Sequence, residues 1–257
     1  MTMAVTIVQV NRVSVDFSGF KALNKVNFYM DTGELRFLIG PNGAGKTTLL
    51  DVICGKVKPT EGEVLFGDTI DIGKLSEYRI ARYGVSRKFQ TPSIFEYLTV
   101  LENMELSLKS GRGLVSSCFR KPDSAARDQI HAVLRNVDLD EKADQKAGYL
   151  SHGEKQWLEI AMTIMQEPKL LLVDEPVAGM TGRERNRTGE ILMEIAEERS
   201  VLVVEHDMNF VKRFAKKVTV LHEGRVLCEG TFEEVSNDPT VIDVYLGRGG
   251  EAENAFH

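Results

Sequence analysis

The sequence predicts an α/β fold built on a largely parallel sheet, and two observations support this prediction. Patterns typical of strands and of helices alternate through most of the 257 residues, as in sheets whose faces are covered by helices. A glycine-rich run at 40–48, GPNGAGKTT, also joins an apolar strand to a helix. In such folds, ligands bind at the edge formed by the carboxyl ends of the strands.

Apolar and β-branched runs in the first part of the chain predict short strands around one helix. The predicted elements are strands at 5–15 and 35–39, a helix at 45–54 and a strand at 64–66. A less apolar section follows, with helices predicted at 100–109 and 124–137 and a loop at 110–122 that contains Gly, Ser and Pro. We expect this section to form an inserted helical lobe.

The second part of the chain returns to alternating strands and helices. Ser151 and Glu154 have the spacing of a capping box, so a helix is predicted to begin here with ordered backbone N–H groups at its positive end. The remaining predicted elements are strand 169–173, helix 184–199, strand 201–204, a short helix after Asp207, and strands 217–221 and 225–228.

Composition limits the classes of function. The formal net charge of -6 gives no broad positive field for a nucleic-acid backbone, so no nucleic-acid partner is expected. Cys54, Cys118 and Cys228 lack CxxC spacing, as expected for reduced thiols. The N-terminus has no secretory pattern, and no apolar run approaches the roughly 18 to 20 residues that span a bilayer. We therefore expect a cytoplasmic protein.

The run at 40–48 matches a phosphate-binding loop in its strand–loop–helix context. Its glycines let backbone N–H groups close around a phosphate, Lys46 reaches the terminal phosphate oxygens, and the Thr47 hydroxyl is suited to Mg²⁺. Thr48 is expected to support the α-phosphate side. The alternative is a plain glycine-rich turn before a helix, which the flanking strand and helix disfavour.

Further polar residues are expected near this loop. Asp174 and Glu175 end a predicted strand, so Asp174 fits Mg²⁺ coordination and Glu175 fits polarising an attacking water. His206 follows the next strand and is expected at the same sheet edge, in reach of a terminal phosphate. Gln90 lies where the core leads into the helical lobe. For each residue the alternative is an ordinary solvated or packed side chain.

The aromatic residues divide into two groups. Phe17 and Phe20 follow the first strand, where either is able to stack on a purine base, with core packing as the alternative. Trp157 has apolar neighbours at helical spacing, so we expect it to pack inside the protein and assign it no catalysis.

Together these motifs resemble the ATP-binding subunit of an ABC transporter over nearly the whole chain. Gly40–Thr48 resembles the Walker A loop and Leu170–Glu175 the Walker B strand. Leu150–Glu154 resembles the family signature, Gln90 the Q-loop and His206 the switch histidine, all in the family's order.

The resemblance implies an ATPase that uses ATP and Mg²⁺, with defined site residues. The implied catalytic residues are Lys46, Gln90, Glu175 and His206. The implied nucleotide-binding residues are Phe17, Gly40, Asn42, Gly43, Ala44, Gly45, Lys46, Thr47, Thr48, Ser151, Gly153 and Glu154. The implied metal-binding residues are Thr47, Gln90 and Asp174.

The resemblance also implies a P-loop NTPase (RecA-like) fold with an antiparallel β-subdomain and an inserted helical subdomain. One nucleotide-binding domain would span 1–257, with an ATP-binding core at 1–90 and 166–247, a helical subdomain at 91–165 and a tail at 248–257.

The implied partners form a membrane complex. Two ATP-binding subunits, identical or different, close head to tail, so that Ser151 and Gly153 of one touch the γ-phosphate of ATP on the other. The other implied partners are membrane permease subunits and, indirectly, a periplasmic or extracellular solute-binding protein. The chain would be peripheral on the cytoplasmic face of the membrane.

The chain departs from the family pattern at two places. His152 and Glu154 stand where Gly and Gln are common, and Val177–Met180 lacks the usual terminal Asp. We expect His152 to affect either the phosphate contact or the choice of partner.

The amino-acid sequences of several segments indicate the transported solute. VDEPVAGMT, VVEHDM and NDPTVIDVYLGR are similar to importers of the branched-chain amino acid and urea group, and WLEIAM with PVAGMT is most similar to a urea importer. Urea is therefore expected, with branched-chain amino acids as the alternative. An exporter or lipid-extraction ATPase would share every catalytic residue. A soluble ABC ATPase of translation or repair is a further alternative, but such proteins usually have two cassettes or a coiled-coil insertion, and this sequence shows neither. A GTPase is disfavoured because no guanine-reading Asn-Lys-x-Asp sequence follows the loop.

Overall fold

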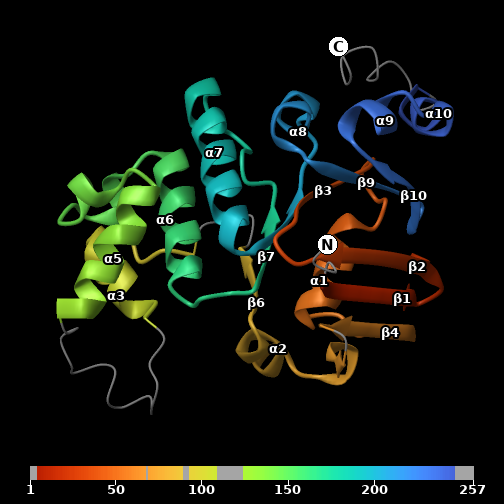
Figure 1. Ribbon diagram of the computed structural model, residues 1–257, viewed down its shortest axis with the longest axis horizontal. Coiled ribbons are helices and arrows are strands. Elements are labelled where there is room, and N and C mark those ends of the chain that lie inside the picture. Colours follow the sequence, from red (N-terminus) through yellow and green to blue (C-terminus); the bar gives the residue numbers. More distant parts are fainter. Residues whose placement is uncertain (1–4, 68, 89–92, 109–123, 247–257) are drawn as a thin grey trace. The chain divides into compact units, whose positions relative to one another are not determined.

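A computed structural model describes residues 5–67, 69–88, 93–108 and 124–246 (Figure 1). The chain divides into two compact units. The first comprises Met1–Arg87, Lys169–Pro176 and Leu192–His257, and the second comprises Lys88–Pro168 and Val177–Ile191.

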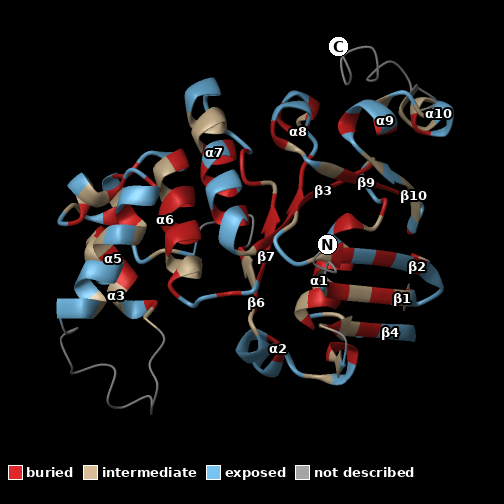
Figure 2. Cartoon of the chain, viewed as in Figure 1, coloured by how far each residue is buried: buried red, intermediate tan, exposed pale blue. Residues whose placement is uncertain are grey.

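The larger sheet has six strands in the order β10-β9-β3-β8-β7-β6. Its strands are β3 (Leu35–Ile39), β6 (Val85–Lys88), β7 (Leu170–Asp174), β8 (Ser200–Val204), β9 (Lys217–His222) and β10 (Arg225–Gly230). β3 pairs in parallel with β8 and β9, and β7 pairs in parallel with β8, whereas β9 and β10 are antiparallel. β3, β7 and β8 are buried along their whole length (Figure 2). The predicted α/β fold with a largely parallel sheet is confirmed.

The smaller sheet has four strands in the order β2-β1-β4-β5 and is antiparallel. Its strands are β1 (Thr6–Phe17), β2 (Phe20–Asp31), β4 (Glu61–Phe66) and β5 (Ile70–Asp71). This sheet confirms the antiparallel β-subdomain that the family resemblance implies.

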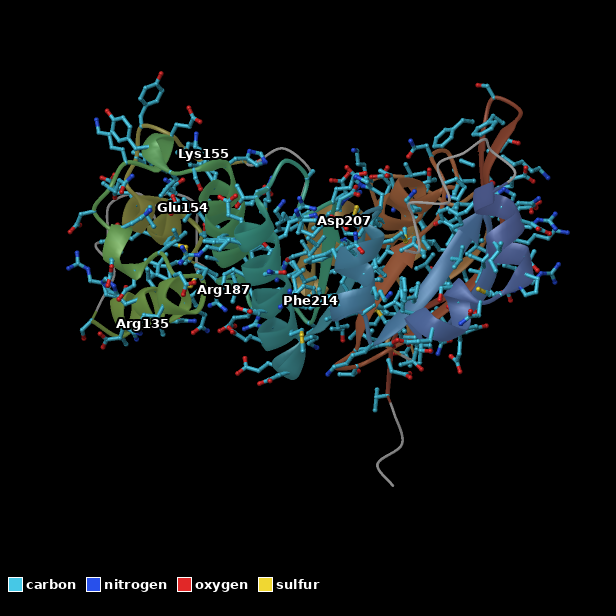
Figure 3. All side chains as sticks on the ribbon, turned by 90° about the horizontal axis from the view of Figure 1, so that it is seen from above. Arg135, Glu154, Lys155, Arg187, Asp207 and Phe214 are labelled. Carbon is cyan, nitrogen blue, oxygen red and sulfur yellow. The ribbon has the colours of Figure 1, made fainter. Side chains whose placement is uncertain are left out.

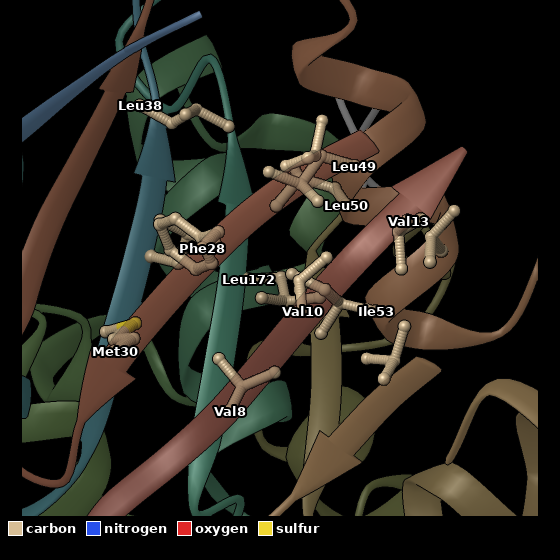
Figure 4. Packing of buried hydrophobic residues seen from close by; sticks show 14 of the residues in the cluster. Val8, Val10, Val13, Phe28, Met30, Leu38, Leu49, Leu50, Ile53 and Leu172 are labelled. Carbon is tan, nitrogen blue, oxygen red and sulfur yellow. The ribbon is translucent and has the colours of Figure 1, made fainter. Parts of the chain in front are cut away.

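One apolar core joins both sheets to the helix that follows the glycine-rich loop, α1 (Lys46–Cys54). Figure 4 shows Val10 of β1 and Phe28 of β2 with Leu49 and Leu50 of α1 and Leu172 of β7. All five residues are fully buried. Burial of this face fixes the start of α1 beside the ends of the sheet strands, because packing rather than propensity supplies most of the stability of a short helix.

The first unit contains further short helices besides α1. They are α2 (Glu77–Tyr83), α8 (Met208–Phe214), α9 (Phe232–Ser236) and α10 (Pro239–Leu246), with a 3-10 turn at Ile72–Lys74. The short helix after Asp207 was predicted and is confirmed. The sequence did not predict β2, β5, β6, α2, α9 and α10.

The second unit is helical. It contains α3 (Val100–Leu106), α5 (Ser124–Asn136), α6 (His152–Ile164), the 3-10 turns Asp140–Lys142 and Ala147–Tyr149, and the first part of α7 (Gly182–Glu198). The predicted loop at 110–122 lies outside the described residues. The predicted packing of Trp157 is confirmed, because its side chain is buried and its Nε1 donates a hydrogen bond to Thr188 Oγ1 at 2.9 Å.

Candidate functional site

The glycine-rich run forms a tight loop between β3 and α1. Gly45 is the N-cap of α1 and has φ of +101°. A Cβ at this position would lie 2.6 Å from Ala22 O, so both the backbone conformation and the space require glycine. The helix was predicted to begin at Gly45 and begins one residue later, at Lys46. The N-terminus of α1 has no side-chain cap, and its first turn has no acidic residue. Its backbone N–H groups are therefore suited to binding an anion.

Lys46 is buried at the centre of this loop. Its Nζ donates hydrogen bonds to Gly40 O at 2.6 Å and Pro41 O at 3.1 Å. Burial lowers the pKa of Lys46, whereas the negative charges of Glu175 and Asp174 act in the opposite direction. The ammonium group is therefore held inside the loop by neutral carbonyl groups, which are weaker partners than phosphate oxygens.

The remaining predicted loop residues differ in exposure. Asn42, Gly43 and Thr47 are exposed, Thr48 is half-buried, and Ala44 is buried with its N–H donating to Pro41 O at 3.1 Å. The Thr47 hydroxyl at the start of α1 is thus open to a ligand.

Asp174 lies at the end of β7, with its side chain held by Arg87 of β6. Arg87 Nη2 donates to Asp174 Oδ2 at 2.9 Å, and Arg87 Nη1 also pairs with Asp51 of α1. Burial raises the pKa of Asp174, and the hydrogen bond and charge of Arg87 oppose this effect. Asp174 Oδ1 is buried and has no hydrogen-bond partner among the residues that the structure describes.

These oxygen atoms fit a magnesium ion. Mg²⁺ prefers oxygen ligands and binds through one or two protein groups together with substrate phosphates. The Thr47 hydroxyl and the orphaned Asp174 Oδ1 supply such a pair. No group of three or more potential metal-binding His, Cys, Asp or Glu residues occurs within the described ranges. Gln90, the third predicted ligand, lies outside them.

Glu175 and His206 come together at the neighbouring strand ends. Glu175 has φ of +46°, and its N–H donates to Val204 O of β8 at 2.9 Å. The Glu175 Oε1 lies 3.7 Å from His206 Nδ1. A non-glycine residue in this left-handed conformation stores strain, which is common where a side chain must be aimed at a reacting group.

Two buried charged residues of this site were not predicted. Glu205 is fully buried, and its Oε2 accepts the backbone N–H groups of His206 at 2.9 Å and Asp207 at 3.2 Å, which fixes the turn that carries His206. Arg87 is the second, described above with Asp174. The sequence contains one sign of Glu205, because an acidic residue directly follows the apolar strand 201–204.

The predicted aromatic residues lie at the turn between β1 and β2. Phe17 and Phe20 are opposite each other across this hairpin and are 49% and 65% exposed. Neither ring is packed in a core, so both are available for stacking.

The signature segment in the second unit begins α6 with the predicted capping box. Ser151 Oγ accepts the Glu154 N–H at 3.2 Å, and Glu154 Oε2 accepts the Ser151 N–H at 2.9 Å. Glu154 Oε1 also pairs with Lys142, so its carboxylate is engaged inside the unit. Figure 3 marks Glu154 and Lys155 on this helix. His152 Nε2 lies 3.2 Å from Ala178 O, which places the unusual histidine against the segment after Glu175.

The loop, the paired acids and the histidine lie where β3, β7 and β8 end, and these features define a P-loop nucleoside triphosphatase fold. A family model described as ABC transporter matches residues 23–178. A second, described as branched-chain amino acid ATP-binding cassette transporter, matches residues 225–251. The chain belongs to the ABC transporter family and is an ATPase of the ATP-binding cassette type.

Curated relatives match nearly the whole chain. The high-affinity branched-chain amino acid transport ATP-binding protein LivG of Escherichia coli (strain K12) is 36% identical, with 95% of this chain and 99% of LivG covered. BraF of Pseudomonas aeruginosa, of the same description, is 34% identical, again with 95% of this chain and 99% of the relative covered.

Solved structures agree with this assignment. The ADP conformation of MJ1267, an ATP-binding cassette of an ABC transporter, is similar with a TM-score of 0.82 and 31% identity over 94% of this chain and 99% of that chain. A dimeric post-hydrolysis state of the cassette MJ0796 bound to ADP and Pi has a TM-score of 0.73 and 28% identity over 88% and 98%. In the part of this chain that the structure describes, no helix is long and apolar enough to cross a membrane.

Proposed function

We propose that this chain binds and hydrolyses MgATP to drive solute import through a membrane permease. The observation that carries the proposal is the gathering of Lys46, Asp174, Glu175 and His206 at the ends of neighbouring parallel strands. Such an arrangement places a cation, a metal ligand and a base around one terminal phosphate.

Each side chain has a specific task in this mechanism. Lys46 exchanges its two carbonyl acceptors for β- and γ-phosphate oxygens, and Glu175 orients and polarises the attacking water. His206 contacts the γ-phosphate and holds the water beside Glu175. Thr47 and Asp174 would hold Mg²⁺, which neutralises charge on the phosphates, and Gln90 would complete that site. Phe17 stacks on the adenine base.

The nucleotide site is completed by a second subunit. We propose that residues 1–90 and 166–247 form the ATP-binding lobe and residues 91–165 the helical lobe, although within this division the segment Val177–Ile191 belongs to the second compact unit. Ser151 and Gly153 of one subunit then donate to the γ-phosphate of ATP held by the other, and Glu154 keeps Ser151 in place through the capping box. The dimeric MJ0796 cassette supports a dimer as the working form. The pair would act on the cytoplasmic face of the membrane.

The solute of this importer is proposed to be urea. This proposal is supported by the segments WLEIAM at 157–162 and PVAGMT at 176–181, which are similar to segments of urea importer ATPases. Branched-chain amino acids are the second candidate, favoured by the C-terminal family match at 225–251 and by the descriptions of LivG and BraF.

The test is reconstitution of the chain with its permease and solute-binding protein in liposomes. ATPase activity is measured with urea, with leucine and with neither. Stimulation by urea supports the proposal, and stimulation by leucine alone replaces urea with the second candidate. ATP hydrolysis that responds to no solute, in a complex that is assembled and sealed, contradicts the importer function.

A further inference from the structure

A single carboxylate, that of Glu184, joins the signature segment to the start of α7 in the second unit. Ser151 Oγ donates a hydrogen bond to Glu184 Oε1 at 3.0 Å. The backbone of Gly153 also lies beside this carboxylate, where its N–H helps to lower the pKa of Glu184. In the proposed mechanism this hydroxyl and this amide bind a γ-phosphate. Here the hydroxyl is hydrogen-bonded to an anion of the same chain, and the amide lies beside that anion.

The fit between Glu184 and the signature backbone is close. A Cβ at position 153 would lie 2.6 Å from Glu184 Oε1 and 2.7 Å from its carboxyl carbon. Any side chain at that position would therefore expel the carboxylate or shift the helix start. Glycine at 153 thus lets an anionic group reach the N–H groups at the positive end of α6, which is the geometry by which helix ends bind phosphate.

Capping of α7 explains only half of this arrangement. Glu184 Oε2 accepts the Thr181 N–H at 2.9 Å and the Thr181 Oγ1 at 2.8 Å, which completes a capping box at the start of α7. The other oxygen, Oε1, is not needed for that cap and is directed to Ser151. Hydrogen bonds from Thr181 and Ser151 also lower the pKa of Glu184, so the group is an anion at neutral pH.

We propose that Glu184 is an internal anion that occupies the phosphate donors of the signature segment until the γ-phosphate of ATP on a partner subunit displaces it. This inference rests on the proposed function, in which Ser151 and Gly153 act across a dimer. Two anions cannot share those donors without strong repulsion, so Glu184 opposes dimer closure and raises the ATP concentration that closure requires.

The test measures ATP-driven dimerisation of the full chain in a Glu175→Gln background, where hydrolysis is expected to be blocked. Sedimentation velocity gives the ATP concentration at half-maximal dimer formation. Glu184→Gln keeps an oxygen acceptor for the α7 cap but removes the charge. Glu190→Gln is the matched control, because it removes an exposed carboxylate of the same helix that pairs with Arg187 and not with the signature segment.

We expect Glu184→Gln to lower the half-maximal ATP concentration by about tenfold, the effect of one charge-assisted hydrogen bond. The melting temperature and the ATP affinity of the monomer should stay at the parent values. Glu184→Asp, whose shorter side chain still caps α7 but does not reach Ser151, should shift dimerisation in the same direction. It serves as the second variant if Glu184→Gln proves unstable.

The outcomes separate this inference from the proposed function. An unchanged or higher half-maximal ATP concentration in Glu184→Gln overturns the inference, and so does an equal shift in Glu190→Gln. The proposed function fails instead if the Glu175→Gln parent does not dimerise with ATP, or if Ser151→Arg dimerises normally. If Ser151→Arg blocks dimerisation and Glu184→Gln has no effect, only the role of Glu184 is wrong.

Discussion

Replacing Arg87 by Met tests how the fold holds the buried Asp174. The side chains of Arg87 and Asp174 are 5% and 4% exposed, and Arg87 also pairs with Asp51, which is 15% exposed. Methionine fills a similar volume but leaves Asp174 as a buried carboxylate without its cation. Breaking a buried ion pair in this way costs about 3–5 kcal/mol. For a chain of this size the melting temperature then falls by roughly 6–20 °C.

Differential scanning calorimetry without nucleotide measures this effect. Arg79→Met is the matched control, since Arg79 is an exposed arginine on the neighbouring helix α2 and should change the melting temperature by no more than about 2 °C. The double variant Arg87→Met/Asp174→Asn should recover about 1–3 kcal/mol relative to the sum of the single effects, because the stranded charge is removed. A loss below about 1 kcal/mol in Arg87→Met, or strict additivity of the two changes, would refute the reasoning.

Three further changes test separate parts of the site. Glu175→Gln should keep ATP binding, trap an ATP-bound dimer and lose most turnover, and near-normal phosphate release would show that Glu175 does not organise the water. Ser151→Arg should leave ATP binding to the monomer intact but block ATP-driven dimerisation, so normal dimers by light scattering would contradict its action across the interface. Gly45→Ala should cost about 1–3 kcal/mol and weaken ATP binding, because its Cβ would meet Ala22 O at 2.6 Å. Gly19→Ala has a similar positive φ but nothing within 4 Å of its Cβ, and should be milder in calorimetry and leave ATP affinity unchanged.

Local rules predicted the phosphate loop and the capping box. Gly45, Lys46 and Thr47 follow a strand and open a helix at fixed spacing, so the backbone conformation and the side-chain positions are determined within a few residues. Ser151 and Glu154 satisfy each other across three positions. Both features depend on contacts between near neighbours in the chain, which is why the sequence was sufficient.

The missed elements depend on tertiary contacts. Lys and Asn residues interrupt the apolar pattern of β2, so the sequence does not mark it as a strand. The segment is a strand because it pairs with β1. Helix α9 begins with a capping box from Thr231 to Glu234, which is a local signal that marks its start in the sequence. Helices α2 and α10 are short, so their propensity is a weak signal compared with packing.

The missed charged residues have partners far away in sequence. Arg87 lies on a short strand and meets Asp174 and Asp51 only after the sheet and α1 assemble. Glu184 meets Ser151 across 33 positions. A charged residue is usually exposed to solvent. The local sequence therefore gives no sign that a charged residue will pair with a group from a distant part of the chain.

The central claim is that each ATP site combines the Lys46 loop of one subunit with Ser151 of another. The most direct measurement is ATPase complementation between a Lys46→Ala chain and a Ser151→Arg chain. Each variant alone has both sites of a homodimer broken, whereas a mixed dimer contains one intact site. The account predicts that mixing two inactive proteins restores hydrolysis. Activity that stays at the level of the separate variants, with mixed dimers present, would contradict it.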